Sequence, residues 1–157
     1  MLFGAPQMWW DDRGPRPRPH EGLDLCFYWS QGLETRQVDV QTQIPAMYDG
    51  TVVHLCEDLI GRSVMMEHRW PAMPGCIYTL YGHTRPRAGL AVGQTIRAGE
   101  IVARLAPVTR PGATVLPHLH ISVGWSSEPV APERLAWNIL PEVLHLLDPL
   151  PLLSSGH

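Results

Sequence analysis

The chain has 157 residues, of which 45% are hydrophobic and 17% are charged, and its formal net charge is −3 at pH 7. This length and apolar content suit one domain with a buried core. The small net charge argues against a nucleic acid or an anionic membrane surface as a partner. No stretch approaches the roughly 20 apolar residues that span a bilayer.

The first 19 residues are rich in proline and arginine and are predicted to form an extended arm that leads into the domain. Residues 1–10 are apolar, but they lack a basic segment, a sustained apolar core and a small-residue cleavage site, so no export signal is predicted. The sequence therefore leaves the compartment open between the cytoplasm and, if a signal has been removed, the cell envelope or the exterior.

A mainly β domain is predicted over residues 20–130. The 16 prolines and 14 glycines of the chain leave little room for long helices before residue 131. Glycine-containing turns between short aliphatic runs, as at 46–52, 91–96 and 98–102, are typical of small barrel-like sandwiches. Six segments rich in β-branched, aromatic or alternating residues are the predicted strands: 23–28, 50–55, 63–68, 76–81, 101–105 and 118–123.

Residues 131–157 are predicted to form a helical segment followed by a tail. Pro132 suits a helix start, and the residues that follow carry an apolar stripe with a spacing of four. Pro141 interrupts this stripe, so two short helices or one kinked helix are expected. The stripe consists of Leu135, Ile139, Val143 and Leu147.

The three cysteines, Cys26, Cys56 and Cys76, are an odd number and form no spaced framework of the kind that staples small secreted domains. None of them belongs to a CxxC pair or a mixed Cys/His pair. A thiolate zinc site is therefore disfavoured, and the cysteines are predicted to be small buried residues.

Two short clusters contain residues of the types that serve as metal ligands in proteins. His20 and Asp24 are separated by three residues, and Gly22 between them is expected to let the backbone bend at a strand entrance. His118 and His120 alternate with aliphatic residues, so a strand would turn both imidazoles to one side. A catalytic zinc ion usually takes three protein ligands, and His20, Asp24 and one imidazole of the pair provide that number.

A third element is His83, which follows an aromatic, β-prone run over 78–81 and precedes a turn predicted at 85–87. It is expected at the end of a strand, facing a cleft, with a histidine in a surface loop as the alternative. No role is predicted for the remaining histidines, which are His54, His68, His145 and His157.

The order of these pieces resembles a known family. HxGxD at 20–24, DGTV at 49–52, YxH at 81–83, paired glycine turns and PHLH at 117–120 are together similar to the M23 peptidases, the lysostaphin/LytM-type zinc endopeptidases. The resemblance runs from about His20 to Val123, which is most of the chain.

The resemblance implies a small, mainly antiparallel β-sheet with an open groove. It also implies one Zn²⁺ ion held by His20, Asp24 and His120, with His83 and His118 as catalytic histidines that do not bind the metal. The implied substrates are peptide bonds in bacterial peptidoglycan, often next to glycine. If this family role applies, the protein works in the cell envelope or outside the cell.

The chain departs from the family pattern in three places. The stretch over 106–116 is longer and more apolar than the usual Gly/Ser/Thr-rich loop, which leaves the substrate preference open. Ile121 and Ser122 replace the frequent Phe-Glu, and Thr84 follows His83 where an aliphatic residue is frequent.

Two other functions compete with this one. A non-catalytic M23-like module for cell-wall binding or regulation is possible in principle, although inactive members usually lack ligands that this chain retains. The glycine turns over 92–102 also resemble carrier sandwiches. The chain has no lysine for lipoylation, and a histidine phosphocarrier has no use for the carboxylate of Asp24.

Overall fold

The computed structural model describes residues 1–10, 14–30, 32, 34–70, 73–109, 114–136 and 138–154. Its strands are β1 (Leu23–Leu25), β2 (Phe27–Trp29), β3 (Thr35–Gln37), β4 (Gln43–Pro45), β5 (Gly50–Glu57), β6 (Arg62–His68), β7 (Cys76–Pro86), β8 (Thr95–Ile96), β9 (Ile101–Leu105), β10 (Leu119–Ser126) and β11 (His145–Leu147). Its helices are short: the 3₁₀ helix η1 (Pro132–Arg134), α1 (Leu140–Val143) and α2 (Pro149–Ser154). The predicted fold class, mainly β with short C-terminal helices, is confirmed.

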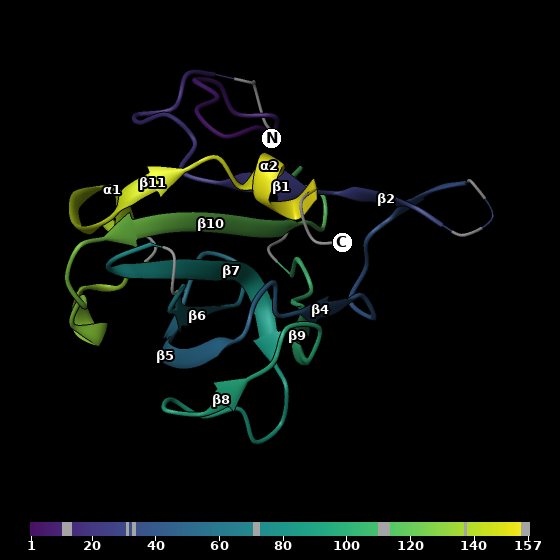
Figure 1. Ribbon diagram of the computed structural model, residues 1–157. Coiled ribbons are helices and arrows are strands. Elements are labelled where there is room, and N and C mark those ends of the chain that lie inside the picture. The colour runs from purple at the N-terminus through teal and green to yellow at the C-terminus, as the bar shows by residue number, and fades with distance from the viewer. Residues whose placement is uncertain are drawn as a thin grey trace.

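Antiparallel pairing joins most of these strands into one sheet (Figure 1). The order across the sheet is β1, β10, β7, β6, β5 and β8, while β11 also pairs with β10, and β9 pairs with both β7 and β4. Within the described residues the sheet does not close into a barrel. It therefore keeps an open face on which a groove can form.

Each of the six predicted strand segments overlaps an observed strand, and β7 extends farthest beyond its predicted end. It continues through His83 to Pro86, so the predicted turn at 85–87 is wrong. The strand continues because it changes partner: Thr84 to Pro86 pair with Leu105 to Ala103 of β9. His83 thus lies within the strand, just before this change of partner.

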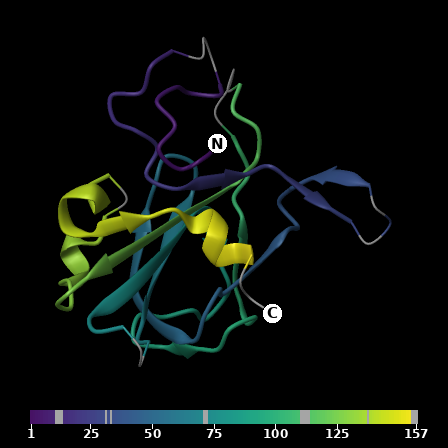
Figure 2. The same cartoon turned by 45° about the horizontal axis from the view of Figure 1, so that its top comes forward.

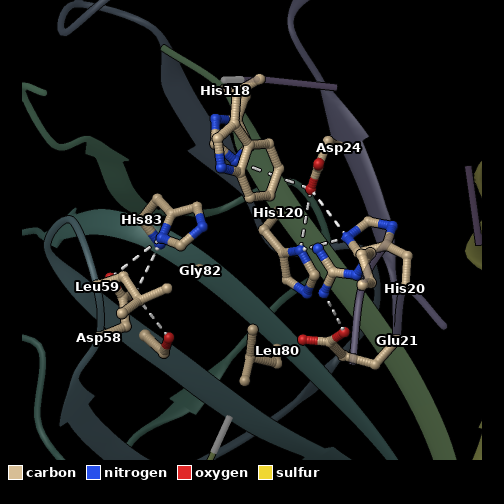
Figure 3. Close-up of a pocket in the computed structure, with 13 residues that line it drawn as sticks. His20, Glu21, Asp24, Asp58, Leu59, Leu80, Gly82, His83, His118 and His120 are labelled. Carbon is tan, nitrogen blue, oxygen red and sulfur yellow. Dashed lines mark hydrogen bonds and ion pairs between the residues drawn. The ribbon is translucent and has the colours of Figure 1, made fainter. Parts of the chain in front are cut away.

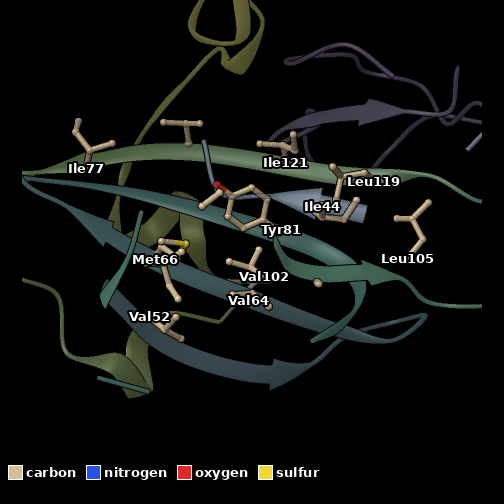
Figure 4. Close-up of a cluster of buried hydrophobic side chains, with 14 of the residues drawn as sticks. Ile44, Val52, Val64, Met66, Ile77, Tyr81, Val102, Leu105, Leu119 and Ile121 are labelled. Atoms are coloured by element: carbon tan, nitrogen blue, oxygen red, sulfur yellow. The ribbon is translucent and has the colours of Figure 1, made fainter. Parts of the chain in front are cut away.

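The hydrophobic side chains divide between the two faces of the sheet. One face carries the larger core, where alternate residues of β6, β7 and β10 meet (Figure 4). Tyr81 is fully buried there, and its hydroxyl accepts a hydrogen bond of 2.8 Å from the backbone N–H of Met47. The opposite face carries a second cluster, which consists of Met65, Cys76, Tyr78, Leu80, Leu135, Leu140 and Leu144.

The C-terminal segment covers one end of this second face. Its short helices match the expectation, but Leu147 of the predicted helical stripe lies in a strand. The edge of β10 accounts for this difference, because Val123 to Trp125 pair with residues 145–147 and offer the backbone hydrogen bonds that a helix would otherwise supply internally. The remaining half of the face is left for the groove.

Two segments lie outside the sheet (Figure 2). The described part of the N-terminal arm runs beside β1, and the β2–β3 hairpin projects away from the sheet edge. No helix in the described ranges is long and apolar enough to cross a membrane. Cys76 is buried, as predicted, while Cys26 and Cys56 are half-buried.

Candidate metal centre

Three adjacent strands place the candidate residues in one row across the sheet. Asp24 of β1 lies opposite His120 of β10, and His120 lies opposite Gly82 of β7. Residues that are directly opposite in antiparallel strands point to the same face. Gly82 leaves room for the imidazole, since a Cβ atom there would lie 3.3 Å from the Cβ of His120.

Three side-chain atoms converge at one end of this row (Figure 3). The Nδ1 atom of His120 lies 3.0 Å from Oδ1 of Asp24 and 3.1 Å from Nε2 of His20. The third side of the triangle, from Nε2 of His20 to Oδ1 of Asp24, measures 3.2 Å. All three side chains are buried, so an interior cluster of one carboxylate and two imidazoles results.

The triangle fits a zinc ion in both size and chemistry. A tetrahedral zinc centre has bonds of about 2.0–2.1 Å, and hence ligand–ligand edges of about 3.3 Å. The edges here, from 3.0 to 3.2 Å, need only a slight expansion to reach that size. Two imidazole nitrogens and one carboxylate oxygen also form a donor set that zinc accepts, and they leave a fourth position open.

The environment favours the metal-binding protonation states of Asp24 and His120. Burial alone would raise the pKa of Asp24, but its contacts with His120 and His20 outweigh burial and hold the pKa well below its usual range. Burial lowers the pKa of His120, although the Asp24 carboxylate opposes this shift. A carboxylate and a neutral imidazole are the forms that donate electron pairs to a metal ion.

The nitrogens that face away from the triangle have partners of their own. Nδ1 of His20 lies 3.1 Å from the carbonyl oxygen of Leu2, and Nε2 of His120 lies 2.8 Å from Oγ of Ser122. A carbonyl oxygen only accepts, so Nδ1 of His20 carries the proton and its Nε2 atom keeps a lone pair inside the triangle. A serine hydroxyl can accept or donate, so Ser122 is able to accept the proton of Nε2 of His120 when Nδ1 binds a metal ion. Ser122, which replaces the frequent glutamate, thus contacts a candidate ligand directly.

His118 lies beside the triangle. Its Nδ1 atom donates to the carbonyl oxygen of Leu116 over 2.8 Å, which turns Nε2 toward Asp24, with a distance of 3.8 Å to Oδ1. Burial lowers the pKa of His118 to about 4, despite the opposing charge of Asp24. His118 is therefore neutral at pH 7, and its Nε2 lone pair is available next to the metal-binding atoms.

His83 faces His118, with their ring centroids 4.8 Å apart. The sequence did not single out its partner, Asp58, in the loop between β5 and β6. Oδ1 of Asp58 lies 3.1 Å from Nδ1 of His83, and Oδ2 accepts the backbone N–H of His83 over 2.8 Å. These two contacts hold both the ring and the backbone of His83, whose φ of 61° is in the left-handed region.

The carboxylate of Asp58 is itself fixed in place. It accepts the backbone N–H groups of Ile60 and Gly61 and the hydroxyl of Ser63, each within 2.9 Å. Burial would raise the pKa of Asp58, but its hydrogen bonds to His83 and Gly61 outweigh burial and lower the pKa. Since an ionised carboxylate only accepts hydrogen bonds, Nδ1 of His83 carries the proton and Nε2 is left for the groove.

One pocket joins these groups. Besides the candidate ligands, it is lined by His83, His118, Asp58, Leu59, Trp10 and Arg16. The five histidine and aspartate residues predicted from the sequence thus lie together, and the loop residues Asp58 and Leu59 close the opposite side (Figure 3).

A protein-family comparison matches residues 28–132, about two thirds of the chain, to the model described as peptidase family M23. The chain belongs to peptidase family M23. This M23 match contains His83, His118 and His120, whereas His20 and Asp24 precede it, so their assignment rests on the geometry of the triangle. No curated protein sequence matches the chain.

Solved structures share the fold of this M23 chain. The catalytic domain of the antimicrobial peptidase lysostaphin from Staphylococcus simulans superposes with a TM-score of 0.60 at 16% sequence identity, covering 99% of this chain and 90% of that domain. LytU gives a TM-score of 0.57 at 19% identity, with 99% of this chain and 83% of that chain covered. At these identities the likeness concerns the fold.

The M23 chain also shows why Gly22 separates His20 from Asp24. The expected backbone bend is present at Gly22, directly before β1, but its φ angle is not positive, so the bend alone does not require glycine. Space is the reason: a Cβ atom at Gly22 would lie 2.3 Å from the carbonyl oxygen of Ile121 and 2.8 Å from Nε2 of His120. The glycine lets β1 approach β10 closely enough for the triangle to form.

We therefore expect Gly22→Ala to lower the free energy of unfolding by about 1–3 kcal/mol and to weaken metal binding, because the backbone of β10 must shift. Chemical denaturation and zinc titration measure the two effects. Gly32→Ala is the matched control, since the nearest atom to a Cβ there is Oγ of Ser30 at 3.8 Å. Equal behaviour of the two variants would contradict the close approach as the reason for Gly22.

The loop at 106–116, which is longer and more apolar than in the family pattern, is described except for residues 110–113. Its Leu116 contributes the carbonyl oxygen that orients His118. Outside the pocket, His68 is completely buried, and its two ring nitrogens lie within 2.9 Å of the carbonyl oxygen of Asp49 and Oγ1 of Thr79. His68 is thus a structural residue of the core.

Proposed function

We propose that this chain is a zinc-dependent endopeptidase that hydrolyses peptide bonds in bacterial cell-wall peptidoglycan. The observation that supports it best is the triangle of His20, Asp24 and His120, with edges of 3.0 to 3.2 Å, in a chain of peptidase family M23. We propose glycine-rich bridges as the first candidate for these bonds, and the pentaglycine assay below tests it. The substrate class itself comes from the family resemblance of the sequence motifs.

In this proposal His20, Asp24 and His120 hold one zinc ion, through Nε2, Oδ1 and Nδ1 respectively. Bound zinc supplies Lewis acidity toward a carbonyl oxygen and makes water a nucleophile near neutral pH. The protein contributes the shape of the site: the three side chains are buried, their ligand atoms lie within 3.2 Å of one another, and Leu2 and Ser122 contact the outer ring nitrogens.

His118 is proposed as the general base. Its Nδ1–H group is held by Leu116, and its unprotonated Nε2 atom lies 3.8 Å from Oδ1 of Asp24, beside the three ligand atoms. An imidazole in this position can accept a proton from the attacking water and later donate it to the leaving amine.

His83 is proposed to stabilise the oxyanion of the tetrahedral intermediate or to carry the proton onward. Asp58 stabilises a positive charge on this ring and fixes its direction. The two histidines are in contact, so their roles are exchangeable in principle, and a comparison of their variants is needed to separate them.

The proposal is tested by metal analysis followed by cleavage assays on purified peptidoglycan and on pentaglycine. We expect about one zinc ion per chain, release of new amino termini from peptidoglycan, loss of activity with a chelator and recovery with added zinc. A His120→Ala variant, which lacks one corner of the triangle, is the negative control for both measurements.

Two results would contradict the proposal in different ways. A folded chain that binds no zinc removes the metal mechanism. A chain that binds zinc and peptidoglycan but releases no amino termini is a non-catalytic M23-like module, the alternative function. Cleavage of peptidoglycan without cleavage of pentaglycine would restrict the substrate to bonds outside glycine bridges.

A further inference from the structure

The N-terminal arm pairs with residues 20–24, the segment that carries two of the candidate ligands. The backbone N–H of His20 donates to the carbonyl oxygen of Ala5 over 3.0 Å. In return, the backbone N–H of Gly4 donates to the carbonyl oxygen of His20 over 2.8 Å. Farther along, the backbone N–H of Asp24 donates to the carbonyl oxygen of Met1 over 2.8 Å. The arm is therefore packed as an extra strand-like segment along β1 (Figure 2).

The arm then brings an indole ring to the triangle. Nε1 of Trp9 donates a hydrogen bond of 2.8 Å to Oδ2 of Asp24. The edge of the same ring system meets the imidazole of His118, with centroids 5.3 Å apart and planes at 85°. Trp9 thus contacts one candidate ligand and one candidate catalytic residue, although it lies outside the family match.

The two oxygens of Asp24 have different partners. Oδ1 faces His20 and His120 at 3.2 and 3.0 Å, whereas Oδ2 accepts from Trp9 at 2.8 Å and lies 3.8 Å from the amino group of Met1. The Asp24 side chain is only 2% exposed, so little water is available to replace a lost donor. An indole N–H can donate but never accept, and it therefore fixes which way the carboxylate is rotated.

We propose that Trp9 is a positioning residue of the metal centre: its indole N–H holds the Asp24 carboxylate so that Oδ1 alone faces the metal position. This inference rests on the proposed zinc function. Groups that orient metal ligands typically change metal affinity by about tenfold to hundredfold when they are removed. Trp9 is also placed to limit the rotation of the His118 ring, so its loss affects two members of the site.

The decisive variant is Trp9→Phe, which removes the N–H donor and keeps an aromatic ring against His118. The zinc dissociation constant is measured by competition with a chromogenic chelator, starting from metal-free protein. We expect it to rise about tenfold to hundredfold. We also expect the absorption spectrum of the cobalt-substituted protein to change, because the carboxylate is free to rotate.

Trp125→Phe is the matched control. Nε1 of Trp125 donates to the carbonyl oxygen of Pro74 over 2.9 Å, at the opposite end of β10 from the triangle. The control variant loses an indole hydrogen bond of the same kind, so a general loss of stability affects both variants. Only the loss at Trp9 is expected to change zinc affinity and the cobalt spectrum.

A wild-type measurement supports the variants in case Trp9→Phe folds poorly. Zinc addition to ¹⁵N-labelled protein is expected to shift the indole N–H signal of Trp9 and to slow its exchange with solvent, while the signal of Trp125 stays in place. Wild-type affinity in Trp9→Phe, or an unshifted Trp9 signal on zinc binding, would overturn the inference and leave the proposed function intact. A wild-type chain without zinc affinity would overturn both.

Discussion

Replacement of His118 or His83 by alanine is expected to leave about one zinc ion per chain and to lower the rate of peptide cleavage by about 10²- to 10⁴-fold, the usual contribution of general acid–base catalysis. Neither side chain provides a corner of the triangle, whose three atoms belong to His20, Asp24 and His120. Metal analysis of the purified variants and initial cleavage rates on peptidoglycan measure the two quantities separately.

The contrast with other histidines makes this experiment specific. His120→Ala is expected to lose both zinc and activity, because His120 contributes two of the three edges. His54→Ala, on β5 and outside the pocket, is expected to retain both. Loss of zinc from His118→Ala would instead identify His118 as a fourth ligand, since its Nε2 atom lies 3.8 Å from Oδ1 of Asp24.

The fold was predictable where hydrophobic side chains alternate along the chain. β6 and β10 are buried strands with β-branched residues, and both overlap predicted segments, 63–68 and 118–123. Among the strands that were missed, β3 and β4 have three residues each, Thr35–Gln37 and Gln43–Pro45, and β8 is only Thr95–Ile96. Such strands are created by pairing with a neighbour rather than by their own composition.

The C-terminal stripe shows the opposite error. A spacing of four predicted a helix that includes Leu147, yet residues 145–147 form β11. Pro141 lies in the first turn of α1, and the chain is extended from Leu144, where the edge of β10 offers residues 145–147 the backbone hydrogen bonds that so short a helix lacks. Periodicity alone contains no information on such an edge.

The site was predictable where spacing carries the chemistry, as in HxGxD at 20–24 and HxH at 118–120. It was not predictable where a partner comes from a distant loop. Asp58 precedes His83 by 25 residues, and Trp9 precedes Asp24 by 15. Neither residue belongs to a motif, so only folding brings them to the groups that they orient.

Asp58→Asn is expected to lower the turnover number by about 10²- to 10⁴-fold while zinc occupancy stays unchanged. The carboxylate accepts from donors on both oxygens, including the backbone N–H and Nδ1 of His83. An asparagine amide turns an NH₂ group toward one of these sets whichever way it is oriented, which sets donor against donor. His83 is then released from its position or changes the nitrogen that carries its proton.

Asp39→Asn provides the matched control for this last variant. Asp39 also accepts backbone N–H groups within its own loop, from Gln41 and Thr42 over 2.8 and 3.1 Å, but it lies in an exposed turn that does not line the pocket. It is expected to keep full turnover.

If Asp58→Asn loses thermal stability but keeps its turnover number at 25 °C, Asp58 only holds the loop between β5 and β6 together. A loss of turnover with zinc retained identifies the Asp58–His83 contact as part of the working site. If Asp58 served only to hold the loop, the orientation of the His83 imidazole would not affect turnover.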